Sequence, residues 1–116
     1  MIREREGISV PKFLIKASYT VEGLKGLQKD KASGREKAIA AAIEAVGGKL
    51  EGLWYGIGEE AHVYALVDVP SIVVCAAFHV KLGASGLATN STTALLTVAE
   101  MDKALSEDIT YRLPGT

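Results

Sequence analysis

The side chains best suited to chemistry gather in the stretch YGIGEEAHVYALVDVP, residues 55–70, where two adjacent glutamates precede a histidine. A histidine near a carboxylate or a lysine such as Lys16 can act as an acid, a base or a group that orients a ligand. The other interpretation of His62 is a hydrogen-bonded histidine at a strand edge or dimer interface, without a chemical role. Glu59 and Glu60 are adjacent, so their side chains point apart, which is typical of a solvated turn.

A second candidate centre combines Cys75 with His79, four residues further along. On one helix face these two residues could act as nucleophile and base. The surrounding segment is strongly apolar, however, and buried cysteines are usually inert, so we predict that Cys75 is structural. The two histidines lack the spacing of metal ligands, and Gly56-Ile57-Gly58 lacks the third glycine of a dinucleotide-binding loop. We therefore expect no metal and no cofactor, and we assign no catalytic residue.

The composition limits the classes of partner. Thirteen basic and fourteen acidic residues leave a formal net charge of -1. This balance differs from the basic surface of a nucleic-acid-binding protein, and it opposes self-association little. No apolar run reaches the ~20 residues of a membrane span, and the opening MIREREGISVP lacks the apolar stretch of a signal peptide. With a single cysteine, which fits a reducing compartment, we expect a cytoplasmic protein that binds neither nucleic acid nor membrane.

The first half of the chain predicts a strand, a broken helix and a second strand. Alternation of apolar and polar residues over Lys12–Tyr19 indicates a strand, and Thr20 can cap the helix that follows. The stretch KDKASG interrupts the helical pattern, which resumes as an amphipathic helix and can end at Gly47-Gly48. Residues 49–55 then predict the second strand.

The second half predicts a hairpin partner, a helix, a strand and a short final helix. The third strand covers about residues 62–69, after the turn GIGEE. Pro70 suits the start of a mostly buried helix that closes near Gly83, and GLATNSTTALL indicates an irregular fourth strand. The tetrapeptide TVAE at 97–100 has the pattern of a capping box, which opens a helix over about residues 98–106.

This order of elements, β-α-β-β-α-β with an added C-terminal helix, is the split βαβ pattern of ferredoxin-like folds. The predicted class is α+β with an antiparallel sheet. Both helices of such a fold cover one face of the sheet, so the other face must meet water or another chain. We predict one domain over residues 11–109, with a flexible arm at 1–10 and a tail at 110–116.

Strand alternation assigns the side chains to the two faces of the sheet. Those expected to face the helices are Phe13, Ile15, Ala17, Val63, Ala65 and Val67. Those expected on the opposite face are Leu14, Lys16, Ser18, His62, Tyr64, Leu66 and Asp68. The second strand contributes to that opposite face either Leu50 and Trp54, or Glu51, Leu53 and Tyr55.

The face without helices is therefore mixed, with apolar groups beside a lysine, a histidine and a carboxylate. Such a face suits a partly dry interface or a cavity, and two sheets packed together would enclose one. We accordingly predict a homodimer or a higher oligomer. Lys16, His62 and Tyr64 are the predicted ligand-binding residues, able to orient a polar group while Leu14 and Leu66 supply apolar walls.

Four stretches in order resemble the GYD-domain family: PKFLIKASYTVEGLKGL (11–27), GGKLEGLWYGIG (47–58), VYALVDVP (63–70) and TTALLTVAEM (92–101). The resemblance spans about residues 11–101 and implies a ferredoxin-like subunit that pairs as a dimeric α/β barrel. The Gly-Tyr-Asp tripeptide that names the family is not retained intact, because Gly58 is followed by Glu-Glu-Ala-His. If that tripeptide has a chemical role, either His62 replaces its aspartate or the role is absent.

Two classes of function fit these observations. In the first, the barrel binds a small, partly apolar molecule or simply assembles, without chemistry. The alternative is a cofactor-independent monooxygenase or isomerase, of the kind that related dimeric barrels host, and it rests on analogy of fold alone. The lack of metal and cofactor motifs favours the first class.

Overall fold

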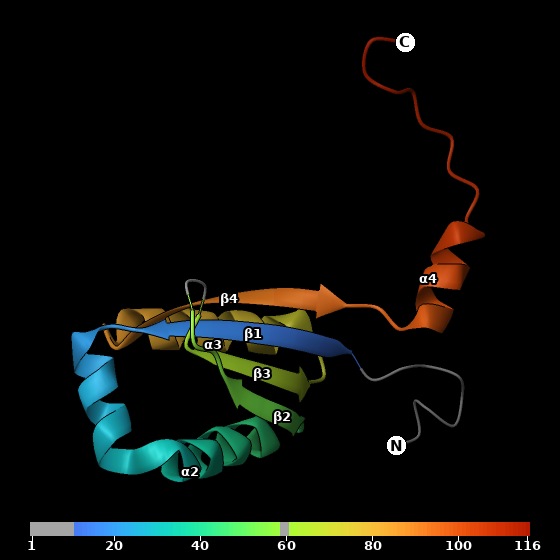
Figure 1. Ribbon diagram of the computed structural model, residues 1–116. Coiled ribbons are helices and arrows are strands. Elements are labelled where there is room, and N and C mark those ends of the chain that lie inside the picture. The colour runs from blue at the N-terminus through green and yellow to red at the C-terminus, as the bar shows by residue number, and fades with distance from the viewer. Residues whose placement is uncertain (1–10, 59–60) are drawn as a thin grey trace.

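The computed structural model of the chain describes residues 11–58 and 61–116, so the arm predicted at 1–10 and the carboxylates Glu59 and Glu60 lie outside it. It confirms an α+β architecture that is consistent with a ferredoxin-like fold (Figure 1). Four antiparallel strands form one sheet in the order β2-β3-β1-β4. The elements are β1 Lys12–Tyr19, α2 Val21–Ala45, β2 Lys49–Tyr55, β3 Val63–Asp68, α3 Ile72–Ala84, β4 Ala88–Leu95 and α4 Val98–Leu105.

The core lies between the sheet and the helices α2 and α3. In the β1–β3 pair, Phe13 lies opposite Val67. Both belong to a buried cluster that also contains Ile43 of α2 and Cys75 of α3. Because side chains alternate along a strand, the odd-numbered residues of β1 and β3 face the helices, and the even-numbered ones lie on the other face. This is the assignment that the sequence predicts for these two strands.

Strand β2 departs from both alternatives that alternation offers. Leu50 lies opposite Val67, but the next pair in register is Gly52 with Leu66, so Glu51 is the extra residue of a β-bulge. The bulge puts Leu50 and Leu53 on the same side, and both pack against the core. Trp54, opposite Tyr64, therefore lies on the other face. A strict period of two cannot anticipate this mixture, because the bulge reverses the alternation halfway along the strand.

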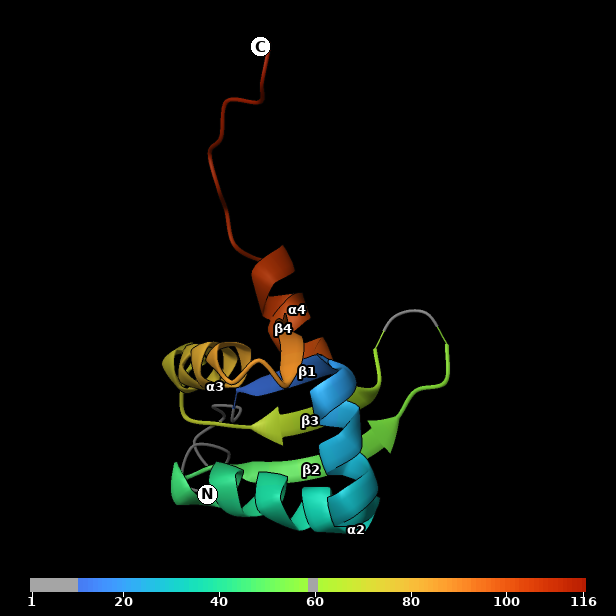
Figure 2. The ribbon, with the colours of Figure 1, turned by 90° about the vertical axis from the view of Figure 1, so that its left-hand side faces the viewer.

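Helix α2 consists of two arms, as the interrupted helical pattern predicts. The break falls at Lys31, within KDKASG, where φ is 66° and ψ is 163°, a conformation outside the helical region. Figure 2 shows the two arms meeting at a marked angle. The second arm brings Ile39 and Ile43 onto the core. It ends at Ala45, and Gly47 turns the chain away with a φ of 83° while the Gly48 N–H donates to the Ile43 carbonyl.

Helix α3 corrects the prediction of a mostly buried helix. Cys75 is its one buried residue, whereas Ile72, Val73 and Val80 are each more than half exposed. The helix is apolar around much of its circumference, but within one chain only the side turned to the sheet is covered. Despite this composition, no helix within residues 11–58 and 61–116 is long and apolar enough to cross a membrane.

The start of α2 packs closely against the turn before β4, where Thr20 forms hydrogen bonds and Gly23 leaves room for the approach. The Thr20 N–H donates to the Leu87 carbonyl over 2.9 Å, and the Thr20 hydroxyl donates to the Gly86 carbonyl over 2.9 Å. A β-carbon at Gly23 would lie 2.0 Å from the same Leu87 oxygen. Glycine weakens a helix by its flexibility, yet here no other residue allows the helix to approach the turn so closely.

We predict opposite effects for two alanine substitutions in this helix. Gly23→Ala should lower the free energy of unfolding by about 2–3 kcal/mol, because the new methyl group meets backbone that cannot move aside. Gly26→Ala is the matched control, since a β-carbon there meets no atom within 4 Å, and it should raise stability by up to about 1 kcal/mol. Urea denaturation followed by circular dichroism measures both. Equal stability of the two variants would contradict the close approach.

Candidate functional site on the helix-free face

The face of the sheet turned away from α2 and α3, called the helix-free face below, draws residues from all four strands. Its members are Lys12, Leu14, Lys16 and Ser18 of β1, Gly52 and Trp54 of β2, Tyr64, Leu66 and Asp68 of β3, and Thr89, Ser91, Thr93 and Leu95 of β4. Cross-strand pairing arranges these side chains in rows, with direct neighbours about 5 Å apart.

One row carries the groups best able to bind a ligand. Trp54 lies opposite Tyr64, Tyr64 opposite Lys16, and Lys16 opposite Ser91. An indole, a phenol, an ammonium group and a hydroxyl thus follow one another across the sheet. The structure thereby brings together two of the three predicted ligand-binding residues, Lys16 and Tyr64. Lys16 and Tyr64 are half-buried, which leaves part of each side chain accessible.

The adjacent row is apolar at its centre. Leu14 lies opposite Leu66, and both are half-buried although no helix covers them. Trp54 is 57% exposed. Its ring lies against Gly52, where a β-carbon would come within 2.3 Å of the indole. The centre of the face is therefore a patch of leucine side chains beside an aromatic row.

A depression of about 250 Å³ opens beside the row of Trp54, Tyr64 and Lys16, over β1 and β4. It is lined by Lys16, Ser18, Ala61, Thr89, Asn90 and Ser91. Hydroxyl, amide and ammonium groups of this lining can contact the polar part of a ligand, while the leucine patch suits an apolar part. The sequence prediction omitted the β4 hydroxyls, whose alternation at 89, 91 and 93 was the available signal.

His62, the third predicted ligand-binding residue, contacts Tyr19 at the end of the sheet. Its Nδ1 accepts a hydrogen bond from the Tyr19 N–H over 2.8 Å. Its ring stacks on that of Tyr19, with centroids 5.9 Å apart and planes inclined by 16°. Because Nδ1 is an acceptor, the neutral ring carries its proton on Nε2. Tyr19 lies opposite the buried Ala88, so these contacts draw the imidazole toward the helix side of the sheet.

The proposed pair of Cys75 and His79 is not supported by the geometry. Cys75 is 2% exposed, and its burial raises the pKa of the thiol, which disfavours the reactive thiolate. His79 is exposed, and its Nδ1 lies 3.0 Å from the side-chain oxygen of Asn90 on β4. In the described part of the chain, no three His, Cys, Asp or Glu side chains form a group that could hold a metal ion.

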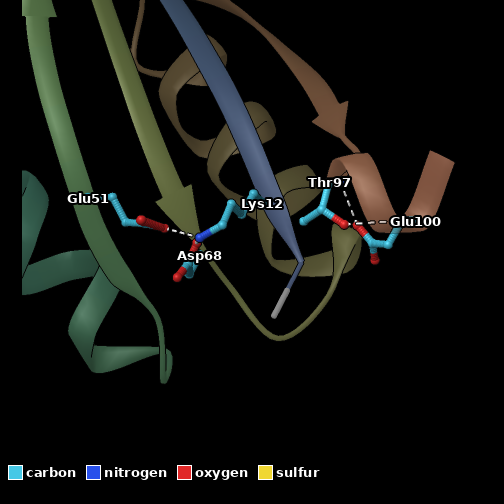
Figure 3. A network of polar contacts seen from close by, with 5 residues as sticks. All are labelled: Lys12, Glu51, Asp68, Thr97 and Glu100. Atoms are coloured by element: carbon cyan, nitrogen blue, oxygen red, sulfur yellow. Dashed lines mark hydrogen bonds and ion pairs between the residues drawn. The ribbon is translucent and has the colours of Figure 1, made fainter. Parts of the chain in front are cut away.

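A charged cluster lies at the other end of the helix-free face (Figure 3). The Lys12 ammonium group donates to Asp68 Oδ1 over 2.9 Å and also forms an ion pair with Glu51. The bulge in β2 places Glu51 there while Leu53 stays on the core side, a combination that neither alternative from alternation contains. Figure 3 also shows the confirmed capping box, in which Thr97 and Glu100 each accept a hydrogen bond from the other's backbone N–H.

The pKa values of the two carboxylates of this cluster shift in opposite directions. Hydrogen bonding with Asp68 and then with Lys12 lowers the pKa of Glu51. Burial, followed by the interaction with Glu51, raises the pKa of Asp68. The hydrogen bonds to Glu51 and Asp68 raise the pKa of Lys12. The Lys12 cation keeps both carboxylates compatible with the folded state.

We predict that Lys12→Met destabilises the fold in a pH-dependent manner. At pH 7 it should cost about 1–2 kcal/mol, because two partly buried carboxylates lose their cation. Without that cation both folded-state pKa values rise, and an acid with a raised folded-state pKa gains stability as the pH falls. The deficit should therefore shrink between pH 7 and about pH 4.

Lys25→Met is the matched control for this experiment. Lys25 lies 3.4 Å from Glu22, but these two side chains are 66% and 70% exposed, so its loss should cost no more than about 0.5 kcal/mol at either pH. Urea denaturation at the two pH values gives both free energies. A Lys12→Met deficit that stays constant with pH would mean that only packing was lost.

Comparison with known protein families gives one match. The family model of the GYD domain matches residues 13–105, which is most of the chain and includes the sheet except its first residue, Lys12. Comparisons with curated proteins and with solved structures give no match.

Proposed function

The chain belongs to the GYD-domain family, and we propose that it is a homodimeric binding protein whose two helix-free faces pack together as an α/β barrel. The cavity between the faces would hold a small, partly apolar molecule with a polar or acidic group. The observation that carries the proposal is the composition of the helix-free face, which places a leucine patch beside a row of Trp54, Tyr64 and Lys16.

Pairing of the faces is supported by what a single chain leaves exposed. An antiparallel sheet with one solvated face normally alternates apolar residues inward with polar residues outward. Here Leu14, Leu66 and Trp54 lie on the outward face instead. A second copy of this face would remove that apolar surface from water, and the gain is about 25 cal/mol for each Å² buried.

Binding is supported by the chemistry around the depression. Lys16 can attract an anionic or carbonyl group, and Tyr64 can donate or accept a hydrogen bond beside it. The hydroxyls of Ser18, Thr89 and Ser91 offer further partners along the same side. His62, whose ring stacks on that of Tyr19, is not part of this proposal.

The first prediction of this proposal concerns assembly. Light scattering after size exclusion should give at least twice the chain mass of 12.2 kDa at micromolar concentration. Leu66→Glu should dissociate the dimer, because it places a charge at the centre of the paired faces. Val21→Glu, at an exposed position of the first turn of α2, is the control and should leave the mass unchanged. A monomeric wild-type protein would exclude the barrel.

The second prediction concerns the ligand. Thermal-shift screening of small acids, quinones and phenols should identify a compound that stabilises the protein. Lys16→Met and Tyr64→Phe should then each weaken its binding by about 10- to 100-fold, if each removes a partner of a buried polar group. Lys81→Met, which alters a lysine on the exposed side of α3, should not. Unchanged affinity in both site variants would place the ligand elsewhere.

A further inference from the structure

The chain after β4 forms an arm, residues 96–116, that leaves the body of the domain. Figures 1 and 2, which are related by a quarter turn, both show α4 and the following residues projecting away from the sheet and its helices. The radius of gyration is 17.2 Å, whereas a compact chain of this length has about 13 Å. The arm is thus extended into space that its own domain does not occupy.

The arm is apolar in a pattern that needs a partner. Val98, Met101 and Leu105 recur at the spacing of one helix face, and α4 has no buried residue. Every large apolar residue of the arm is at least 49% exposed, namely Leu96, Val98, Met101, Leu105, Ile109, Tyr111 and Leu113. An eight-residue helix is marginal in water by itself even with a capping box, so packing must supply most of its stability.

From these observations we infer that the arm packs α4 and the tail against a second copy of this chain. The inference rests on the proposed pairing of the helix-free faces. Leu95, the last residue of β4, lies opposite Lys12 on that face, and the arm follows it directly. An arm that starts at the rim of a paired face can reach the partner beside it, and two-fold symmetry makes the exchange reciprocal.

The apolar area of the arm fits this assignment. Burial of its seven large side chains would remove on the order of 400–800 Å² of apolar surface per arm. A stable dimer buries about 800 Å² on each partner. The two arms therefore match the size of a stable interface, and together with the paired faces they would make the dimer an obligate one.

The test substitutes opposite sides of α4 in the full-length protein. Met101→Glu with Leu105→Glu should raise the dissociation constant of the dimer by about ten-fold or more, since charges replace buried side chains. Ala99→Glu with Lys103→Glu introduces the same residue type at the same spacing on the other side of the helix. This control should leave the dissociation constant unchanged. Sedimentation across a concentration series measures both.

Hydrogen exchange gives a second measurement, which distinguishes packing of α4 against a second copy from packing against its own chain. Amides of residues 98–105 should be protected at concentrations where the dimer forms, and should lose that protection in the Leu66→Glu monomer. Equal protection in that monomer would mean that the arm folds onto its own chain, which overturns the inference. Unprotected amides in the wild-type dimer would overturn it as well.

The outcomes also separate this inference from the proposed function. If Leu66→Glu dissociates the dimer but Met101→Glu with Leu105→Glu does not, the paired faces stand and the arm has no part in them. If only the arm variant dissociates it, the arm holds the copies together and the face-to-face pairing is wrong. If both dissociate it, each surface contributes as stated.

Discussion

The register of β1 against β3 is the constraint on which the rest of the structure depends. Phe13 opposite Val67 puts one set of side chains under the helices, and the same pairing puts Leu14, Lys16, Tyr64 and Leu66 on the other side. A slip of one residue would exchange the two sets, bringing a lysine and a tyrosine into the core. The buried cluster around Val67, which is fully inaccessible, therefore fixes the chemistry of the helix-free face as firmly as it fixes the core.

A single layer of helices on a four-stranded sheet leaves a small chain with more apolar surface than it can cover. The core takes the inward side of each element, and three surfaces remain outside it: the helix-free face, the outer side of α3, and the arm. They differ in composition. The helix-free face mixes leucines with groups that can bind a ligand, α3 is nearly uniformly apolar, and the arm carries exposed apolar residues among charged and polar ones. Because of this difference, we propose ligand binding for the helix-free face, and dimerisation for the helix-free face together with the arm.

The bulge at Glu51 links packing to electrostatics. It lets Leu50 and Leu53 both pack against the core, and it also brings Glu51 to the Lys12 ammonium group beside Asp68. The charged cluster and the row of Trp54, Tyr64 and Lys16 lie on either side of the leucine patch on one face. A cavity between two such faces would have polar ends and an apolar middle, which is the arrangement that suits a small molecule with both kinds of surface.

The sequence by itself determined the order of the elements, the strand bounds to within a residue or two, the break in α2 and the capping box of α4. These follow from local properties, because periodicity, glycine and capping side chains act over a few neighbouring residues. It also determined that Lys16 and Tyr64 share a face. Only the tertiary structure decided the bulge in β2, the engagement of His62 with Tyr19, the cluster around Lys12 and the exposure of α3. Each of these depends on residues far apart in the chain, so its energy is set by contacts that no local pattern contains.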